Sequence, residues 1–376
     1  MARSTLRSLA DHFADLPDPR LNRQKQHALL DILVIAVCAI LAGADSWADV
    51  ERFGRAKFDW FQRFLKLPNG IPSHDTFGRV FSLLDPEAFG ACFAAWMAAA
   101  CAPLGLEQVA IDGKTMRGSR GPQGTAAHVV SAFATANGIT LGQRMVDEKS
   151  NEITAIPELL KVLDISGALV TIDAMGCQTK IAQQVRDGGA DYLLAVKENQ
   201  PTLYSDIHQF VTDALAREYT GIGHDLWQDQ ERSHGRDEFR ACYVFDAADV
   251  VCDREPWPDL ASVVMIVSER VVNGTATSES RYDISSRRAG AEAFARSVRN
   301  HWGIENGLHW ILDVCFGDDA SRVRAGHGPE NFALLRRLAL AVLKQAGGKD
   351  SIRGKRLIAG WDNRYLEQLL LGFLRI

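Results

Sequence analysis

Two short apolar segments, each ending in an aspartate, decide how the middle of this chain folds. Residues 107–112 read Glu-Gln-Val-Ala-Ile-Asp, and residues 168–173 read Ala-Leu-Val-Thr-Ile-Asp. Short runs of this kind, rich in β-branched residues, are typical of buried strands. The end of a strand is where an α/β core presents side chains to a cleft. We therefore expect Asp112 and Asp173 to close two neighbouring strands.

A third carboxylate stands in a segment with helical periodicity. Glu305, His309 and Asp313 recur at intervals of four residues, so they share one face of a helix. Tryptophans flank this stripe, and a polar stripe beside bulky indoles is less usual for plain packing. The alternative is that the indoles belong to the core and that His309 and Asp313 form a surface pair.

Two strand-end aspartates and one helical glutamate are the set that a two-metal phosphoryl-transfer site needs. Hard Mg²⁺ ions prefer a few carboxylate oxygens and keep their other positions for water and phosphate. We predict that Asp112, Asp173 and Glu305 are catalytic and bind Mg²⁺, with Mn²⁺ as a substitute. The competing interpretation is that the aspartates are turn residues, as most Asp-Gly pairs are.

The segment from 106 to 216 alternates between strand and helix patterns. This order predicts an α/β core with a mixed sheet, and it matches the ribonuclease-H-like layout, in which three strands precede the helical crossovers. The expected strands are 107–112, 127–135, 139–146, 168–173 and 191–196, and the expected helices are 154–163, 178–188 and about 199–217.

The flanking segments differ from this core. Residues 1–104 predict an all-helical N-terminal domain that includes an apolar helix over 29–41, and residues 105–376 predict the catalytic domain. Within the latter, 218–285 reads as a β-rich insertion and 286–376 as a helical part. The expected strands are 238–245, 262–268 and 275–284, and the expected later helices are 291–312, 329–346 and 363–373.

Composition limits the class of protein. The longest apolar run, Ile32 to Ala44, is too short for the roughly 20 residues of a membrane span, so we expect no membrane partner. Seven cysteines without a CxxC pair indicate reduced thiols in a cytoplasmic protein. The net charge of −5 argues against nucleic acid, but Arg281 to Ile376 holds 16 basic and 10 acidic residues. A basic C-terminal third is suited to phosphates, although a solvated helix face is an equal explanation.

Several basic residues near the predicted strand ends are candidates for DNA contact. Lys114 and Arg117 follow the first aspartate, and Lys197 follows the strand 191–196. His234 and Arg236 lie in a polar, turn-like stretch. The alternatives are a turn role for Lys197 and a solvated hairpin for the stretch around His234.

At several places the sequence resembles the ISAs-type, H-repeat-associated DDE transposases, which are related to the insertion-sequence-four group. The segments that carry the resemblance cover nearly the whole chain and are specific only together. They are 18–20 (Asp-Pro-Arg), 41–47 (Leu-Ala-Gly-Ala-Asp-Ser-Trp), 70–79 (Gly-Ile-Pro-Ser-His-Asp-Thr-Phe-Gly-Arg), 110–114 (Ala-Ile-Asp-Gly-Lys), 172–174 (Ile-Asp-Ala) and 301–314 (His-Trp-Gly-Ile-Glu-Asn-Gly-Leu-His-Trp-Ile-Leu-Asp-Val).

The resemblance implies a ribonuclease-H-like catalytic core and the triad Asp112, Asp173 and Glu305. It also implies metal-dependent cleavage and strand transfer on double-stranded DNA, at the terminal inverted repeats of an insertion sequence and at target DNA. Because two ends must be held together, we expect a homodimer on DNA.

One signature of the wider group is missing around the glutamate. The group carries a Tyr seven residues before the glutamate, an Arg four residues before it and a Lys seven residues after it. At these positions this chain has Val298, His301 and Leu312, respectively. The basic residue that contacts end DNA would then be His301 or Arg299, with His309 as a further DNA-binding candidate.

The predicted function is therefore a DNA transposase. The alternative from a different class is a catalytically inactive or co-opted DNA-binding protein derived from a transposase. A third hypothesis is a metal nuclease that cuts DNA without a joining step.

Overall fold

The computed structural model describes residues 9–21, 25–101, 106–120, 126–146, 151–233, 236–272 and 275–373. His234, a predicted DNA-binding residue, lies outside these ranges. The contacts divide the chain into two compact units: unit 1 comprises 1–105, 113–149 and 305–376, and unit 2 comprises 106–112 and 150–304. A packing unit and a domain are different properties, so the expected domain boundaries stay predictions.

Unit 1 starts with helices whose ends are set by local capping. The side chains of Ser46 and Ser73 accept hydrogen bonds from the backbone N–H groups of Asp49 and Thr76, three residues further on. This arrangement satisfies donors that the first turn of a helix leaves free. The helices are α1 (Leu9–Phe13), α2 (Leu29–Leu41), α3 (Trp47–Ala56), α4 (Phe58–Phe61), α5 (His74–Leu83) and α6 (Pro86–Cys101).

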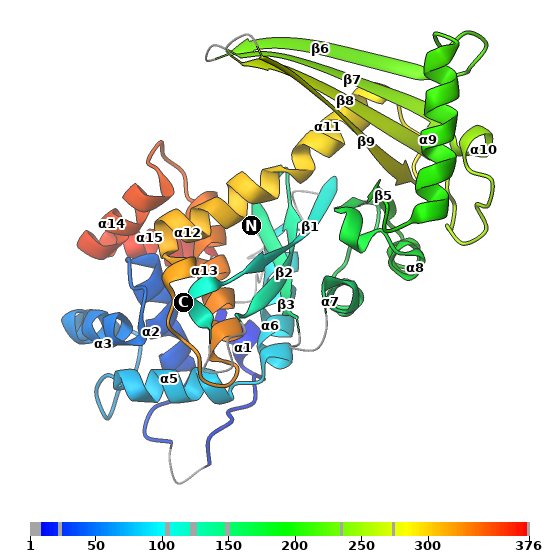
Figure 1. The fold of residues 1–376 in the computed structure, drawn as a ribbon. Coiled ribbons are helices and arrows are strands. Elements are labelled where there is room, and N and C mark those ends of the chain that lie inside the picture. Colours follow the sequence, from blue (N-terminus) through cyan, green and yellow to red (C-terminus); the bar gives the residue numbers. More distant parts are fainter. Residues whose placement is uncertain are drawn as a thin grey trace, which may run out of the picture. The chain divides into compact units, whose positions relative to one another are not determined.

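Two helices from opposite ends of the chain form the centre of unit 1. α2 is buried from Asp31 to Leu41, and α13 (Gly328–Gln345) is buried from Gly328 to Leu343. α13 packs against α2, α5 and α6, and Figure 1 shows α2 and α13 side by side. A helix that is apolar all round is a buried helix, and this prediction for 29–41 is confirmed. In the described part of the chain, no helix is long and apolar enough to cross a membrane.

A buried ion pair joins α13 to the segment that precedes it in unit 1. Arg336 Nη1 lies 2.7 Å from Asp318 Oδ1, and the two side chains are 1% and 0% exposed. The guanidinium carbon of Arg336 also lies 4.3 Å from the centre of the Phe332 ring. An isolated charge at such a place would be very costly, so each partner depends on the other.

A large mixed sheet runs through the structure, as the sequence predicts. β2 (His128–Ala134) and β3 (Ile139–Met145) pair antiparallel in unit 1, and β1 (Gln108–Thr115) is the neighbour of β2. β1 contributes residues to both units. In unit 2 it pairs parallel with β4 (Leu169–Ile172), which pairs parallel with β5 (Asp191–Val196). The helices α7 (Glu152–Leu160) and α8 (Thr179–Asp187) precede β4 and β5 in the chain.

The β-rich segment of unit 2 continues the same sheet. β9 (Thr275–Ser285) pairs antiparallel with β5, and β8 (Ser262–Val272), β7 (Arg236–Asp246) and β6 (Asp225–Ser233) follow in that order. β6 was not expected, since its sequence is polar and it is an exposed edge strand. A short helix, α10 (Ala247–Val250), follows β7.

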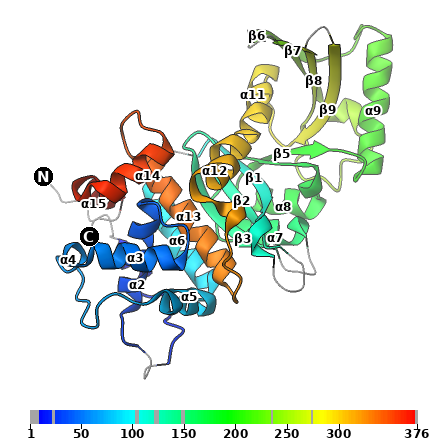
Figure 2. The same cartoon turned by 60° about the vertical axis from the view of Figure 1, so that its left-hand side comes forward.

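Helices cover both faces of this antiparallel part of unit 2. Phe294 of α11 (Ala291–His301) packs into a cluster with Val244 and Val264. The next residue of β7, Phe245, faces the other way and contacts Phe210 of α9 (Pro201–Ala216) with ring centres 5.2 Å apart. Figure 2 shows α9 and α11 on opposite sides of the strands.

The segment after α11 is not the single helix over 291–312 that the sequence predicts. Residues 305–309 form a π-helical turn, and α12 (Trp310–Phe316) follows it. α12 ends at Gly317, whose φ of 57° is the left-handed conformation that glycine adopts easily. The expected helices 329–346 and 363–373 are confirmed as α13 and α15 (Asn363–Phe373), whereas α14 (Ile352–Trp361) was missed.

Candidate active site

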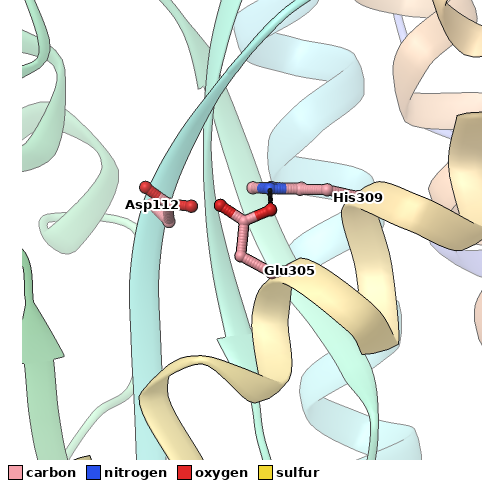
Figure 3. A group of neighbouring side chains, drawn as sticks. All are labelled: Asp112, Glu305 and His309. Carbon is pink, nitrogen blue, oxygen red and sulfur yellow. Dashed lines mark ion pairs between the residues drawn. The ribbon is translucent and has the colours of Figure 1, made fainter. Parts of the chain in front are cut away.

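Three side chains from two elements form a cluster of metal-ligand type. Asp112 lies on β1, and Glu305 and His309 lie on the π-helical turn. One ligand atom from each of the three lies within 4.8 Å of the others. Figure 3 shows the Glu305 carboxylate between the Asp112 carboxylate and the His309 ring. Two carboxylates and one imidazole are donors that divalent cations accept.

Glu305 and His309 meet on one face of the π-helical turn. Side chains four residues apart already share a face in a regular helix, and these two remain on one face in the π-helical turn. His309 Nδ1 lies 3.6 Å from Glu305 Oε2. Glu305 is exposed and His309 is buried, so the histidine forms the inner side of the cluster.

His309 presents a neutral ring at pH 7. Burial lowers the pKa of His309 to about 3, and the positive charges of Arg337 and Lys114 act in the same direction. A neutral imidazole is the form that can bind a metal ion. In the sequence His309 lies on the same helical stripe as Glu305, and its role as a DNA-binding residue stays a prediction. The four-residue spacing was the available signal for a shared site.

Asp112 and Asp173 each directly follow one of two paired residues on adjacent parallel strands. Ile111 of β1 is paired with Ile172 of β4, and each aspartate is the next residue. β1 was expected to end at Asp112 but continues to Thr115, so Asp112 lies inside the strand. Within the described residues, Asp173 is not part of the cluster of three ligand atoms.

The Asp173 carboxylate is engaged with the backbone that follows it. Its Oδ1 accepts hydrogen bonds from the N–H groups of Met175 at 3.0 Å and Gly176 at 3.3 Å. Burial raises the pKa of Asp173 above its ordinary value, while these N–H groups lower it in part. The second carboxylate oxygen accepts neither of these bonds.

A pocket of about 820 Å³ lies within unit 2 beside Asp173. Lys197 and His301, two of the predicted DNA-binding residues, line it together with Asp173. Lys197 is exposed, directly after β5. His301 Nδ1 lies 3.0 Å from the Thr171 hydroxyl, and burial lowers the pKa of His301 to about 4. His301 is therefore neutral at pH 7 and offers no positive charge to a phosphate.

The sequence analysis missed a buried acid in the same pocket. Asp283 lies on β9 and is 7% exposed. Burial raises its pKa to about 7. The signal in the sequence was an aspartate between Tyr282 and Ile284 in a strand pattern, where a buried position is normally apolar.

We predict that Asp283→Asn flattens the pH dependence of stability. Between pH 4 and pH 7 the native Asp283 binds a proton that the unfolded chain releases, so stability falls as pH rises through this range. The loss that the asparagine variant avoids is at most about 4 kcal/mol. Urea unfolding of both proteins at about pH 5 and pH 8 measures it. Equal losses in the two proteins would contradict the prediction.

Lys114, a predicted DNA-binding residue, is 8% exposed and forms ion pairs inside unit 1. Its Nζ lies 2.8 Å from the Asp313 carboxylate of α12 and 3.2 Å from that of Asp319. The segment after β1 approaches the same region closely, because a Cβ on Gly118 would lie 2.5 Å from the backbone oxygen of Asp319. Lys114 thus joins β1 to α12, and it was not recognisable from sequence because its partners lie some 200 residues later.

Of the remaining predicted DNA-binding residues, two lie on the surface, and the side chain of the third is outside the described part of the structure. Arg117 is 81% exposed, with its Nε 3.6 Å from Asp319. Arg299 of α11 is 63% exposed, 3.7 Å from Glu231. Arg236 begins β7, and its side chain is outside the described part. Arg117 and Arg299 are accessible to a large ligand.

Comparison with known proteins agrees with the motifs of this chain. The family described as "Transposase DDE domain" matches residues 103–342, and the family described as "DDE_Tnp_1-associated" matches residues 10–97. The protein named "Putative transposase YncI" of Escherichia coli O157:H7 is 41% identical over 97% of this chain and 95% of its own length. The "H repeat-associated putative transposase YhhI" of Escherichia coli strain K12 is 40% identical over 98% of each chain.

The fold was also compared with a solved structure of piggyBac transposase in a synaptic complex with hairpin DNA. The match covers 97% of this chain and 76% of the piggyBac chain, with 10% sequence identity and a TM-score of 0.42. This likeness is too low to support an argument. The family match and the relatives over the full length do not depend on it. The resemblance to H-repeat-associated transposases is confirmed, and this chain belongs to the transposase DDE domain family.

Proposed function

We propose that this protein is an active DNA transposase with a ribonuclease-H-like core, in which Asp112, Asp173 and Glu305 form the catalytic site. The observation that carries the proposal is that Asp112 and Asp173, within unit 2, directly follow the paired residues Ile111 and Ile172 of two adjacent parallel strands. The pairing of Glu305 with His309 within unit 1 supplies further ligands of the same type.

The side chains present suit a hard divalent cation. Asp112 and Glu305 offer carboxylate oxygens, which Mg²⁺ prefers, and Asp173 has a carboxylate oxygen besides the one bound to the backbone. His309 adds an imidazole, which Mn²⁺ accepts more readily than Mg²⁺ does. When bound, such an ion supplies a Lewis acid that lowers the pKa of water and neutralises charge on the phosphate.

The reaction requires two displacements at phosphorus. In the first, water attacks a phosphodiester at the element end, the bond from phosphorus to the 3′ oxygen breaks, and a 3′-hydroxyl is released. In the second, this hydroxyl attacks a target phosphodiester, the bond from phosphorus to the 3′ oxygen of the target strand breaks with release of a target 3′-hydroxyl, and a new strand junction forms. The protein's part is to hold the reacting groups in line and to stabilise charge, since phosphoryl transfer needs little other help.

DNA is the proposed partner, and the protein acts as a homodimer on it because two element ends must be joined. Arg117 and Arg299 are exposed cations suited to the phosphates of end or target DNA. The buried Lys114 and the neutral His301 are weaker candidates for direct phosphate contact.

The test is incubation of the purified protein with labelled DNA of its own flanking element ends and a target plasmid. We expect nicks at the ends in Mg²⁺ or Mn²⁺, none in EDTA, and labelled ends joined to the plasmid. DNA with scrambled terminal repeats is the matched control. Binding without cleavage in either metal would favour the inactive DNA-binding alternative, and cleavage without joining would favour a stand-alone nuclease.

A further inference from the structure

A lysine on α13 contacts the π-helical turn from behind. Lys344 Nζ lies 2.6 Å from the backbone oxygen of Gly307, so it donates a hydrogen bond to the middle of the turn. The same nitrogen lies 4.9 Å from the centre of the Phe133 ring of β2. All three residues belong to unit 1. The ammonium group therefore joins a helix, a strand and the turn that carries Glu305 and His309.

The fit around this ammonium group is close. A Cβ on Gly307 would lie 3.1 Å from Phe133 Cζ and 3.6 Å from Lys344 Nζ. A Cβ on Gly138, in the turn between β2 and β3, would lie 3.1 Å from the same Nζ. Both glycines leave the room that the lysine occupies. The enclosure has a cost, since burial lowers the pKa of Lys344 to about 8.

A π-helical turn needs such support. It interrupts the regular i to i−4 hydrogen bonds of the helix, so backbone oxygens in it depend on other donors. π-helical turns are rare and occur mostly as single turns inside α-helices, so a change of this turn to regular α-helix would shift the residues that follow it. A charged donor gives a stronger hydrogen bond than a neutral one.

We infer that Lys344 is a positioning residue that holds the Gly307 carbonyl, and with it the π-helical turn on which the proposed metal ligands Glu305 and His309 lie side by side. The inference rests on the proposed function, because the proposed function assigns divalent-cation binding to the residues of this turn. Lys344 acts through the backbone and touches neither the cation nor DNA.

The experiment measures Mn²⁺ binding to the full-length protein without DNA, by electron paramagnetic resonance of free Mn²⁺. Lys344→Met keeps the length of the side chain and removes the donor. We expect it to weaken Mn²⁺ binding by about 10- to 100-fold, the range for residues that orient metal ligands from behind. Lys344→Gln retains a donor and should recover part of the affinity.

The matched control is Lys355→Met. Lys355 is 5% exposed, and its ammonium group donates to the backbone oxygens of Leu343 and Ala346 at the end of α13. Lys355 belongs to α14, and its variant removes a buried ammonium group that lies at the C-terminal end of α13. The change does not affect the hydrogen bond to Gly307. We expect it to lower thermal stability and to leave Mn²⁺ affinity unchanged. Equal losses of affinity in Lys344→Met and Lys355→Met would overturn the inference, because general loosening would then explain both.

Two further variants keep the test decisive. If Lys344→Met does not fold, Gly307→Ala retains the lysine but pushes the turn away from Phe133, and it should weaken Mn²⁺ binding too. Glu305→Gln tests the site itself. If Glu305→Gln abolishes Mn²⁺ binding while Lys344→Met and Gly307→Ala bind as wild type, the positioning inference fails alone. If Glu305→Gln binds Mn²⁺ as wild type, the proposed metal site fails.

Discussion

Asp112→Asn should lower the rate of DNA end cleavage by on the order of 10³-fold or more while the protein stays folded. Asparagine has the shape of aspartate but no negative charge, so it is a poor ligand for a hard cation. Asp112 is only partly buried on β1, and the exchange leaves the strand pairing of its backbone unchanged. The measurement is the rate of nicking of labelled end DNA at saturating protein, with circular dichroism as the check on folding.

Glu107→Gln is the matched control for this variant. It makes the same change of acid to amide five residues earlier, at an exposed position that precedes β1. It should cleave at the wild-type rate. A folded Asp112→Asn protein that cuts end DNA as fast as Glu107→Gln would contradict the assignment.

Asp173→Asn distinguishes the predicted triad from the cluster that includes His309. Asparagine can still cap the turn after β4, because its side-chain oxygen accepts from Met175 and Gly176 as the aspartate does. The triad predicts a loss as large as that of Asp112→Asn. Cleavage at the wild-type rate by Asp173→Asn, with a large loss in His309→Ala, would show that the cation depends on Asp112, Glu305 and His309 instead.

Asp318→Ala should destabilise unit 1 by about 3–5 kcal/mol, the cost of breaking one partner of a buried ion pair. The variant leaves the Arg336 guanidinium charged and enclosed, 1% exposed, without the carboxylate that lay 2.7 Å away. Chemical denaturation in urea, followed by tryptophan fluorescence, measures the loss. A loss of this size is a large share of the free energy of unfolding of a typical protein. We therefore also expect the variant to express poorly.

Two comparisons separate this effect from other causes. Glu292→Ala breaks an exposed pair with Arg296, 67% and 68% exposed at 3.4 Å, and should cost about 0.5 kcal/mol or less. The double variant Asp318→Leu with Arg336→Met removes both charges and should regain most of the stability. If Asp318→Ala cost no more than Glu292→Ala, the pair would not be the buried contact that the structure describes.

Much of the secondary structure could be predicted because its signals are local. The helix over 29–41 is apolar on every side, and Ser73 marks the start of α5 by its own side chain. β4 follows from a β-branched run, and β5 follows from a short apolar run bounded by turn residues. Strand β6 could not be predicted in this way, because the polar segment 225–233 becomes a strand only through its ladder to β7.

The sequence singles out the three candidate acids, but it does not show which side chains surround the candidate site. Asp112, Asp173 and Glu305 stand out because each interrupts an apolar pattern or lies in a specific motif. Lys114 looked like a free cation, yet Asp313 and Asp319 bury its charge. No pattern near Lys114 contains that information.

The sequence by itself determined most strands and helices of the core, the buried central helix and the family, and it singled out three acids as candidates, because these signals depend on short segments of the chain. Only the tertiary structure decided that Glu305 and His309 share a π-helical turn, that Lys344 holds this turn, and that Asp283 is a buried acid. The physical reason is the same in each case. The energy of a charge or of an unusual helical turn depends on the dielectric and the donors around it, and these come from segments that are far away in sequence.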